Sequence, residues 1–406
     1  MKRIVILCDG TWNRFDARTP TNVVRLAQLL SPTDPKGVTQ VPVYLNGVGT
    51  GVGVIGASRL ADRLLGGAFG WGLLENVVDA YRQLVFLYEP GDEIFIFGFS
   101  RGAFTARSLV GFIRSTGIIG RDDLTLVPRA VRRYRAKGRA DLAPGSDESH
   151  EFRANTMRSC VATSRREREW RRHNGAPEVP LLRVAYLGVW DSVGALGVPR
   201  DVPLFGRRAA RKYEFHDARL SRMVGSARHA VALDETRRSF EPTCWTNVAD
   251  LNVAAGAAAT PPPYQELFFA GDHGSVGGGG NITALSSIAL GWIVEGARLA
   301  GLAFDTSHLT DLQREEDPFG SLCCSSVPPR GFAERITRIA PKARTGPSSC
   351  DAVHASVIER FRGRVGFEAS DPYRPQSLKT IEEALGKLCV NSGSGEEMLL
   401  GPQLTV

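Results

Sequence analysis

The sequence predicts an α/β protein in which helices cover both faces of a mostly parallel central sheet. Short runs of aliphatic and β-branched residues alternate along the chain with segments whose apolar residues recur at helical spacing. The strand candidates are apolar at nearly every position, which is typical of strands buried on both faces. A chain of 406 residues with 43% hydrophobic content can bury one large core of this kind.

The first part of the chain carries two strand candidates. Residues 2–8 form a near-continuous aliphatic run. A glycine-rich passage over 47–72 then leads into a segment, 73–88, with helical periodicity that ends at a Pro-Gly pair. The second strand is expected over 93–99, and a helix from about 103 to 115 follows it at once.

The second part adds strands over 181–190 and 264–271, and a helix over 285–302 follows the last of them. The insertion 121–180, between the second and third strands, is expected to form an Arg-rich helical cap. We therefore assign residues 1–300 to one α/β domain.

Beyond residue 300 the pattern weakens into Pro, Ser and Gly punctuation. We expect residues 301–406 to be an extension packed on the core, with a flexible tail after about residue 391.

The ends and the cysteines narrow the class of protein. The N-terminus has too short an apolar run for a signal peptide, and no window reaches the roughly 18 apolar residues of a membrane helix. The expected location is the cytoplasm, or delivery by a secretion system that needs no signal peptide. Seven scattered cysteines without a CxxC pair predict neither a disulfide framework nor a structural zinc site. No metal and no cofactor are expected.

One short motif indicates catalysis. Gly98, Ser100 and Gly102 match the pattern G-x-S-x-G between a buried strand and a helix. Such a turn strains the serine backbone, which the two small neighbours permit, and exposes the hydroxyl above the sheet edge. The amide of Arg101, at the helix N-terminus, is placed to stabilise an oxyanion. The alternative is an ordinary strand-to-helix turn with a serine N-cap.

A serine nucleophile needs a base and an acid, and in this arrangement the chain order is Ser, Asp or Glu, then His. Asp191 directly follows the strand 181–190, and His273 follows the strand 264–271. Both lie downstream of Ser100 in the required order. A turn or cap aspartate and a hydrogen-bonded loop histidine are the structural alternatives.

Other residues compete for these roles. Asp234 and Asp272 could serve as the acid, and His229 or His354 as the base. The segment SARHAVALDE around His229 is typical of a helix or strand interior, which favours a structural role for that histidine.

A second oxyanion donor is expected from the loop DGTWN after the first strand. Gly10 allows close approach of the backbone, and the amide of Thr11 can point inward. The alternative is a plain Asx or Thr turn.

Taken together, the motifs resemble the α/β-hydrolase family of type VI secretion phospholipase effectors, which also contains uncharacterised bacterial and fungal proteins. The resemblance spans roughly residues 2–300, and a weaker similarity occurs near Tyr373. The segments that carry it are CDGTWN, GVGTG, GGAFGWGLLENVVDAY, GDEIFIFGFSRGAFTAR, YLGVWDSVGALG, ARHAVALDETRRSFEPTCW and FFAGDHGSVGGG.

The resemblance implies an α/β-hydrolase fold and phospholipase A-like cleavage of acyl esters without a metal. It places the nucleophile at Ser100, the acid at Asp191 and the base at His273. The family's histidine loop usually reads G-x-H-S-D-V-G-G-G, whereas Gly274 and Ser275 stand here in place of Ser and Asp. We expect this change to affect how the imidazole is oriented or how the loop is fixed. No delivery module is visible, so secretion machinery or an immunity protein is a partner only if the protein is an effector.

The Arg-rich insertion is the main clue to partners. Between residues 121 and 172 there are 14 Lys and Arg against 8 Asp and Glu. Solvated, salt-bridged helices are the default interpretation. Transient contact with an anionic membrane surface is the alternative, since each basic residue near such a surface contributes about 1 kcal/mol. Nucleic acid is not an expected partner.

The glycine-rich passage contains a match to G-x-G-x-x-G at residues 51–56. A dinucleotide site would need a second strand with an acidic residue about 20 positions later, whereas Asp79 lies within a predicted helix. We expect a mobile loop at the mouth of the active site instead.

Two other functions stay open on the sequence alone. Asp9, Asp191, Asp272 and His273 at strand ends could hold a metal in a phosphoesterase. A non-catalytic binding protein with a degraded triad is the second, and only the altered histidine loop supports it.

Overall fold

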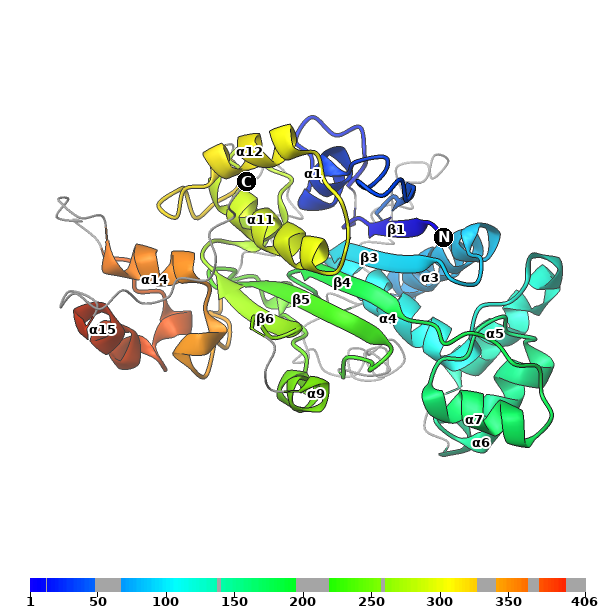
Figure 1. The fold of residues 1–406 in the computed structure, drawn as a ribbon. Coiled ribbons are helices and arrows are strands. Elements are labelled where there is room, and N and C mark those ends of the chain that lie inside the picture. Colours follow the sequence, from blue (N-terminus) through cyan, green and yellow to red (C-terminus); the bar gives the residue numbers. More distant parts are fainter. Residues whose placement is uncertain are drawn as a thin grey trace.

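The computed structural model describes residues 1–11, 13–47, 67–136, 140–194, 219–256, 260–326, 341–363 and 372–391. In this part of the chain six parallel strands form one sheet in the order β2-β1-β3-β4-β5-β6 (Figure 1). The predicted α/β class is confirmed. The strands are β1 (Arg3–Cys8), β2 (Gln40–Leu45), β3 (Glu93–Phe99), β4 (Val184–Trp190), β5 (Val224–Ala232) and β6 (Tyr264–Phe269).

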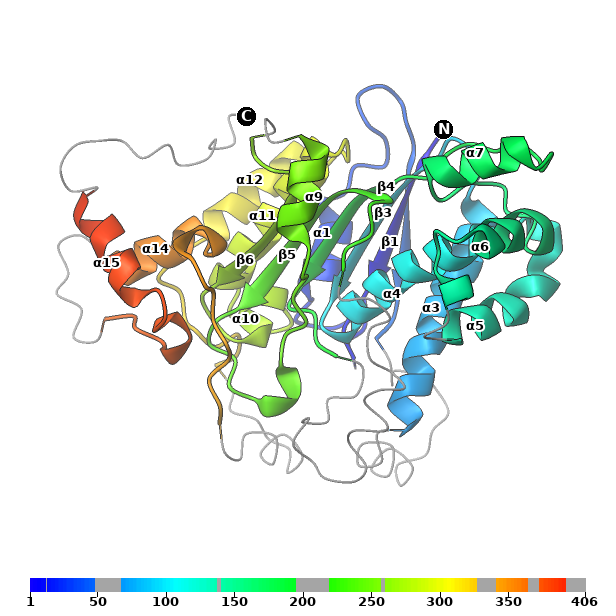
Figure 2. The same cartoon turned by 90° about the horizontal axis from the view of Figure 1, so that it is seen from below.

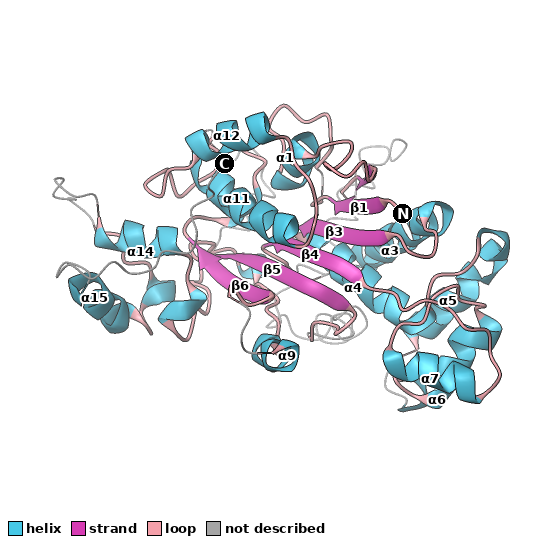
Figure 3. Cartoon of the chain, in the orientation of Figure 1, coloured by secondary structure: helices cyan, strands magenta, loops and turns pink. Residues whose placement is uncertain are grey.

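Helices cover both faces of the sheet, as Figure 3 shows. One layer contains α3 (Gly67–Leu87), α4 (Arg101–Thr116) and α9 (Val248–Ala255). The opposite layer contains α1 (Asn22–Leu29), α11 (Ala284–Leu299) and α12 (Thr306–Glu315).

Burial on both faces of the sheet accounts for the apolar sequences of the central strands. In β1, Ile4 and Ile6 pack under one helical layer and Val5 and Leu7 under the other, all with no exposed surface. Burial on both faces removes the alternation of polar and apolar residues that a half-exposed strand would show. At about 25 cal/mol per Å² of apolar surface, this burial is the main source of stability for the sheet.

Two strands were not predicted as such. The edge strand β2, QVPVYL, contains Pro42, which lacks an amide hydrogen and is tolerated at a sheet edge but weakens a strand signal. The segment around His229 is the interior of β5, one of the two states expected for it. Arg228 and His229 are buried there, and these polar residues obscure the apolar run.

The Arg-rich insertion forms α5 (Val127–Arg135), α6 (Asp147–Glu151) and α7 (Arg165–His173), which lie side by side in Figures 1 and 2. These helices pack near the C-terminal end of α4. Since 16 helical residues span about 24 Å, the insertion lies at the opposite end of this helix from Ser100. The helices therefore do not cover the carboxyl ends of the strands as a lid would.

A buried ion cluster lies inside the insertion. Glu167 is fully buried, and its carboxylate accepts hydrogen bonds from Arg153 Nε at 2.7 Å and Arg171 Nη2 at 3.2 Å. Thr163 donates to the same carboxylate through its amide and its hydroxyl. Part of the arginine content of this segment therefore serves internal packing, in line with the salt-bridged interpretation.

Of the residues beyond 300, α12 packs against α11, whereas the segment 341–363 packs beside the outer strand β6. The segment 341–354 passes the carboxyl ends of β5 and β6, where Val353 forms a bridge with Phe268, before α14 (Ala355–Arg362) and α15 (Glu382–Asn391). The expected flexible tail lies outside the described residues. No helix in the described part combines the length and apolar character required to cross a membrane.

Candidate active site

Ser100 occupies a strained turn between β3 and α4. It is the single residue that separates the end of β3 from the start of α4, and its φ is 57° and its ψ is −121°. A positive φ costs a residue other than glycine about 1–3 kcal/mol, so surrounding contacts must hold it. One such contact is the hydrogen bond from the Ser100 amide to the carbonyl of Trp190, 3.0 Å long.

Three glycines make room for this turn. A Cβ on Gly98 would lie 2.5 Å from the carbonyl oxygen of Gly102, and a Cβ on Gly102 would lie 2.1 Å from that of Cys8. Neither position admits a side chain without a backbone shift. Gly10 also abuts the serine, because a Cβ there would lie 3.3 Å from Ser100 Cβ. The DGTWN loop and the serine turn are thus in direct contact.

Asp191 and His273 meet at the same edge. Phe99 and Trp190 are register partners in β3 and β4, so Ser100 and Asp191 leave adjacent strands side by side. Asp191 is fully buried with φ 39°. His273 begins the short helix α10 (His273–Gly277) after β6, and its Nδ1 lies 2.5 Å from Asp191 Oδ2. The carboxylate can only accept, so Nδ1 donates and Nε2 is the nitrogen that can take a proton.

The imidazole is clamped between two aromatic rings. The Phe99 and Phe240 ring centroids lie 4.6 Å and 4.7 Å from that of His273. Since Phe99 directly precedes Ser100, this stacking places the histidine next to the serine turn. Among the described contacts no hydrogen bond joins the Ser100 hydroxyl to the imidazole, and catalytic hydrogen bonds of this kind often tighten only when substrate binds.

Arg344 pairs with the same aspartate, and no motif or periodicity in the sequence indicates this residue. Its Nη1 donates to Asp191 Oδ1 at 2.6 Å and its Nη2 to Oδ2 at 2.9 Å. The amide of Ala232 donates to Oδ1 at 3.0 Å. Burial alone would raise the pKa of Asp191, but the Arg344 charge and the His273 hydrogen bond outweigh it and hold that pKa below its usual range.

The competing acids have other roles. Asp234 Oδ2 accepts hydrogen bonds from the Tyr373 hydroxyl at 2.7 Å and the Gly271 amide at 2.6 Å. Asp272 caps α10 by accepting from the amide of Ser275 at 2.8 Å. Both carboxylates therefore fix the loops around β6 and do not contact the imidazole of His273.

The competing histidines, His229 and His354, also make other contacts. His229 accepts the amide of Ser192 through Nε2 at 3.1 Å and donates through Nδ1 to Glu266 at 2.8 Å. His354 stacks on Phe269 at 4.5 Å, and burial lowers its pKa to about 4. Neither ring lies beside the serine turn.

The altered histidine loop has its own supports. Ser275 Oγ donates to Asp272 Oδ1 at 3.0 Å or to the carbonyl of Leu322 at 2.9 Å. A Cβ on Gly274 would lie 2.3 Å from Cys324 Sγ, so the cysteine occupies the space that a larger residue would need. The loop is thus held from the side of the C-terminal extension.

The DGTWN loop is anchored by its aspartate. Asp9 accepts hydrogen bonds from the Gly10 amide at 2.7 Å, the Tyr44 hydroxyl at 2.6 Å and the Thr21 hydroxyl at 2.9 Å. Burial raises the pKa of Asp9 despite these bonds. The buried hydroxyl of Thr11 has no hydrogen-bond partner among the described residues. The GxGxxG match at 51–56 lies outside the described residues.

Charged residues surround the histidine. Glu235 accepts a hydrogen bond from the backbone amide of His273 at 3.3 Å. Arg237 donates to the Glu235 carboxylate through Nε at 2.8 Å and Nη2 at 2.6 Å. The Arg237 guanidinium lies 3.8 Å from the ring centre of Phe240. Burial and the nearby Arg237 charge lower the pKa of Arg101 to about 10. The side chains of Arg101 and Arg237 therefore lie near each other, and Arg101 directly follows Ser100.

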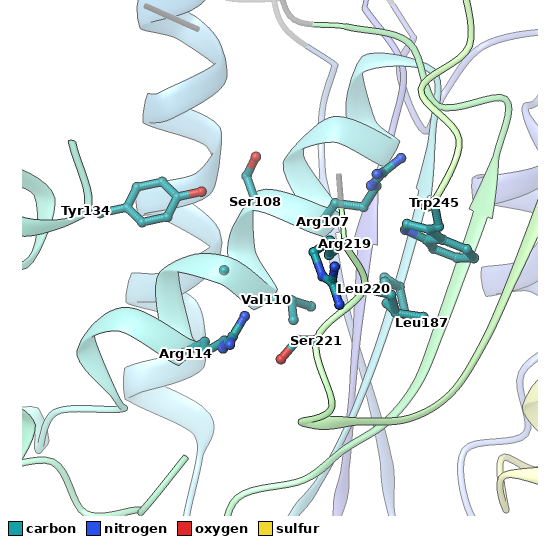
Figure 4. A pocket seen from close by; sticks show the side chains of 11 residues that line it. Arg107, Ser108, Val110, Arg114, Tyr134, Leu187, Arg219, Leu220, Ser221 and Trp245 are labelled. Carbon is teal, nitrogen blue, oxygen red and sulfur yellow. The ribbon is translucent and has the colours of Figure 1, made fainter. Parts of the chain in front are cut away.

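Three cavities in the described part of the chain lie away from this edge, and one of them, of about 310 Å³, lies next to Arg25 and Glu315 between α1 and α12. A small one of about 50 Å³ follows α4 beyond Ser100 and includes Arg114, Ser221 and Trp245 in its lining (Figure 4). A larger one of about 650 Å³ lies at the amino ends of the strands, next to Glu93 and Arg183.

Comparison with known proteins adds independent information. The chain is 29% identical over 256 residues to the uncharacterised protein YEL023C of Saccharomyces cerevisiae, which covers 60% of this chain and 33% of that protein. A solved Tle1 effector bound to the VgrG spike of the type 6 secretion system is 17% identical, with a TM-score of 0.36, over 68% of this chain and 51% of that one. An uncharacterised protein from Pseudomonas aeruginosa is 15% identical, with a TM-score of 0.41, over 98% and 60%.

The chain therefore spans a third of the yeast relative and about half of the solved Tle1 chain. Residues 2–296 match the family model described as "T6SS, Phospholipase effector Tle1-like, catalytic domain". This match covers well over half of the chain, and the protein belongs to the family of Tle1-like phospholipase effector catalytic domains.

Proposed function

We propose that the protein is a serine hydrolase that cleaves acyl esters, with phospholipids as the substrate class and phospholipase A-like cleavage. The observation that carries the proposal is the contact between His273 and Asp191 beside the strained turn of Ser100. A serine forced to a positive φ, next to an imidazole whose tautomer a carboxylate fixes, is the arrangement that nucleophilic acyl transfer requires. Membership of a phospholipase effector family supports the same chemistry.

The mechanism follows from the tautomer. His273 Nε2 takes the proton of the Ser100 hydroxyl as its oxygen attacks the ester carbonyl, and Asp191 stabilises the imidazolium that forms. The amides of Arg101 and Thr11, with Gly10 giving close approach, stabilise the oxyanion. Collapse of the intermediate breaks the ester bond, and the imidazolium gives its proton to the leaving alcohol. Water then attacks the acyl-serine by the same steps and releases the acid.

The phospholipid part of the proposal has one local support. Arg101 directly follows Ser100 in the chain, and its side chain lies near Arg237, whose guanidinium is paired with Glu235. The net positive charge of this group would attract the phosphate of a phospholipid headgroup. Binding to a secretion spike is stated of the solved Tle1 protein, and for this chain it is a proposal that co-purification with a VgrG protein would test.

A metal-dependent phosphoesterase has less support. Asp9, Asp191 and Asp272 are engaged by hydroxyl, guanidinium or amide donors, so a metal would have to displace these bonds. Among the described residues no group of three His, Cys, Asp or Glu side chains is arranged to hold an ion. Loss of turnover on chelation, together with resistance to fluorophosphonate, would reverse this preference.

Fluorophosphonate labelling of the wild type beside the Ser100→Ala variant tests the mechanism. We expect covalent labelling of the wild type only, at Ser100. A panel of phospholipids and short esters then tests the substrate class, with release of free fatty acid as the readout. Unchanged hydrolysis by the Ser100→Ala protein would refute the proposal, and absence of both labelling and turnover would favour a non-catalytic binding protein.

A further inference from the structure

We propose that Arg344 is a positioning residue of the active site, through which the C-terminal segment 341–363 holds Asp191 against His273. The inference rests on the proposed hydrolase function and goes beyond it. The family match ends at residue 296, so the residue that completes the site comes from outside the matched domain.

The geometry fills every acceptor position of the catalytic carboxylate. Oδ1 receives Arg344 Nη1 at 2.6 Å and the Ala232 amide at 3.0 Å, while Oδ2 receives Arg344 Nη2 at 2.9 Å and His273 Nδ1 at 2.5 Å. A carboxylate has about four such positions, so Asp191 cannot rotate without losing a bond. The two parallel bonds from one guanidinium fix the plane of the carboxylate.

Arg344 is itself held rigidly. It is 5% exposed, and its two terminal nitrogens also donate to the carbonyl oxygens of Ala232, at 2.9 Å, and of Phe240. The amide of Lys342 donates to the carbonyl of Thr236 at 3.0 Å, which ties the segment to the chain just after β5. The arginine therefore links the end of β5, the Phe240 turn and the catalytic acid.

The charge of Arg344 adds a second effect. In the Asp191–His273 pair, a cation within 3 Å of Asp191 opposes the binding of a proton by that carboxylate. Other ionisable groups also face this pair and stay in place when only Arg344 is changed. They are Glu235, Arg237, Glu241, Cys244 and Asp272.

Two substitutions separate geometry from charge. Arg344→Lys keeps the charge but cannot bridge both oxygens, so kcat for a short ester should fall about 10- to 100-fold with little change in KM. Arg344→Met removes the charge as well, so the acid limb of kcat/KM should also move to higher pH by about one unit. Arg228→Lys is the matched control, because Arg228 is a buried arginine paired with Glu295 at 2.6 Å far from the site.

A measurement without turnover separates this inference from the proposed function. In the Ser100→Ala background, the downfield proton NMR signal of His273 Nδ1, which reports its hydrogen bond to Asp191, should be present with arginine at residue 344 and lost with Arg344→Met. If the wild type neither labels nor hydrolyses any ester, the hydrolase proposal fails, and this proton signal still decides the role of Arg344.

The inference is overturned by either of two results. One is folded Arg344→Lys and Arg344→Met proteins whose kcat, pH profile and His273 Nδ1 proton signal equal those of their parents. The other is an Arg228→Lys protein with the same loss of kcat, since the effect would then reflect general destabilisation. Thermal unfolding of each variant identifies proteins that are not folded at the assay temperature.

Discussion

Two imidazole–carboxylate pairs in the described part of the chain lie at the outer strands of the sheet and are each joined by a hydrogen bond, and they are built differently. His229 and Glu266 are register partners inside β5 and β6, and both ring nitrogens of His229 are used, by Glu266 and by the Ser192 amide. His273 and Asp191 lie beyond the strand ends, where Nδ1 is fixed by the acid beside the serine turn. Position relative to the end of a strand, rather than the pair itself, separates a structural histidine from a candidate base.

Removal of each histidine should distinguish the two pairs most strongly. His273→Ala should lower kcat/KM by about 10⁶-fold, because the hydroxyl of Ser100 then lacks a base. His229→Gln should keep most of the activity but unfold at lower temperature, since the Ser192 amide or Glu266 loses its buried partner. Ester hydrolysis and thermal unfolding of both variants check this, and a larger activity loss for His229→Gln would invert the assignment.

Neutralisation of each acid should also separate the two pairs. Asp191→Asn should lower kcat by about 10⁴-fold, because an amide no longer selects the imidazole tautomer with a proton on Nδ1. It also leaves Arg344 without its carboxylate. Glu266→Gln should affect stability more than rate. The pairing of roles proposed here would fail if the two variants had equal kcat.

The acid pairs also predict a pH dependence of stability. The folded-state pKa of Asp191 lies below its usual value of about 3.9, so the unfolded chain binds more protons than the native one below about pH 4. The contribution of Asp191 to the free energy of unfolding is complete above this pH and is lost as the pH falls toward the folded-state pKa. Urea unfolding from about pH 6 to about pH 3 should therefore show a steeper decline for the wild type than for Asp191→Asn. Parallel curves would show that the Arg344 pairing does not favour the ionised form.

Much of the site could be predicted because parallel strands end at one edge. Ser100, Asp191 and His273 each follow an apolar run that is legible in the sequence, and the sheet order brings those ends together. Arg344 could not be found in this way. It lies in an irregular segment without periodicity, and only the path of the chain past β5 brings it to the acid.

The position of the Arg-rich insertion could not be predicted from its composition either. From the sequence, Arg153 and Arg171 would be expected on the surface, yet both are buried around Glu167. A helix pattern shows that helices form, but not which end of α4 they pack against.

The smallest expected effect concerns what holds each histidine in place. His229 is fixed by strand pairing, whereas His273 depends on a one-turn helix packed against Cys324. Gly274→Ser restores the residue common in the family loop, but its Cβ would meet Cys324 Sγ at 2.3 Å, so it should destabilise the protein by about 1–3 kcal/mol. Cys324→Ala removes the obstacle, and the double variant should recover most of that loss.

A double-mutant cycle on the free energy of unfolding measures this coupling directly. A positive coupling would show that a side chain at residue 274 and Cys324 compete for one volume. Additive effects would instead mean that the glycine is required for another reason. In that case the position of the His273 imidazole would depend on contacts other than the packing of Gly274 against Cys324.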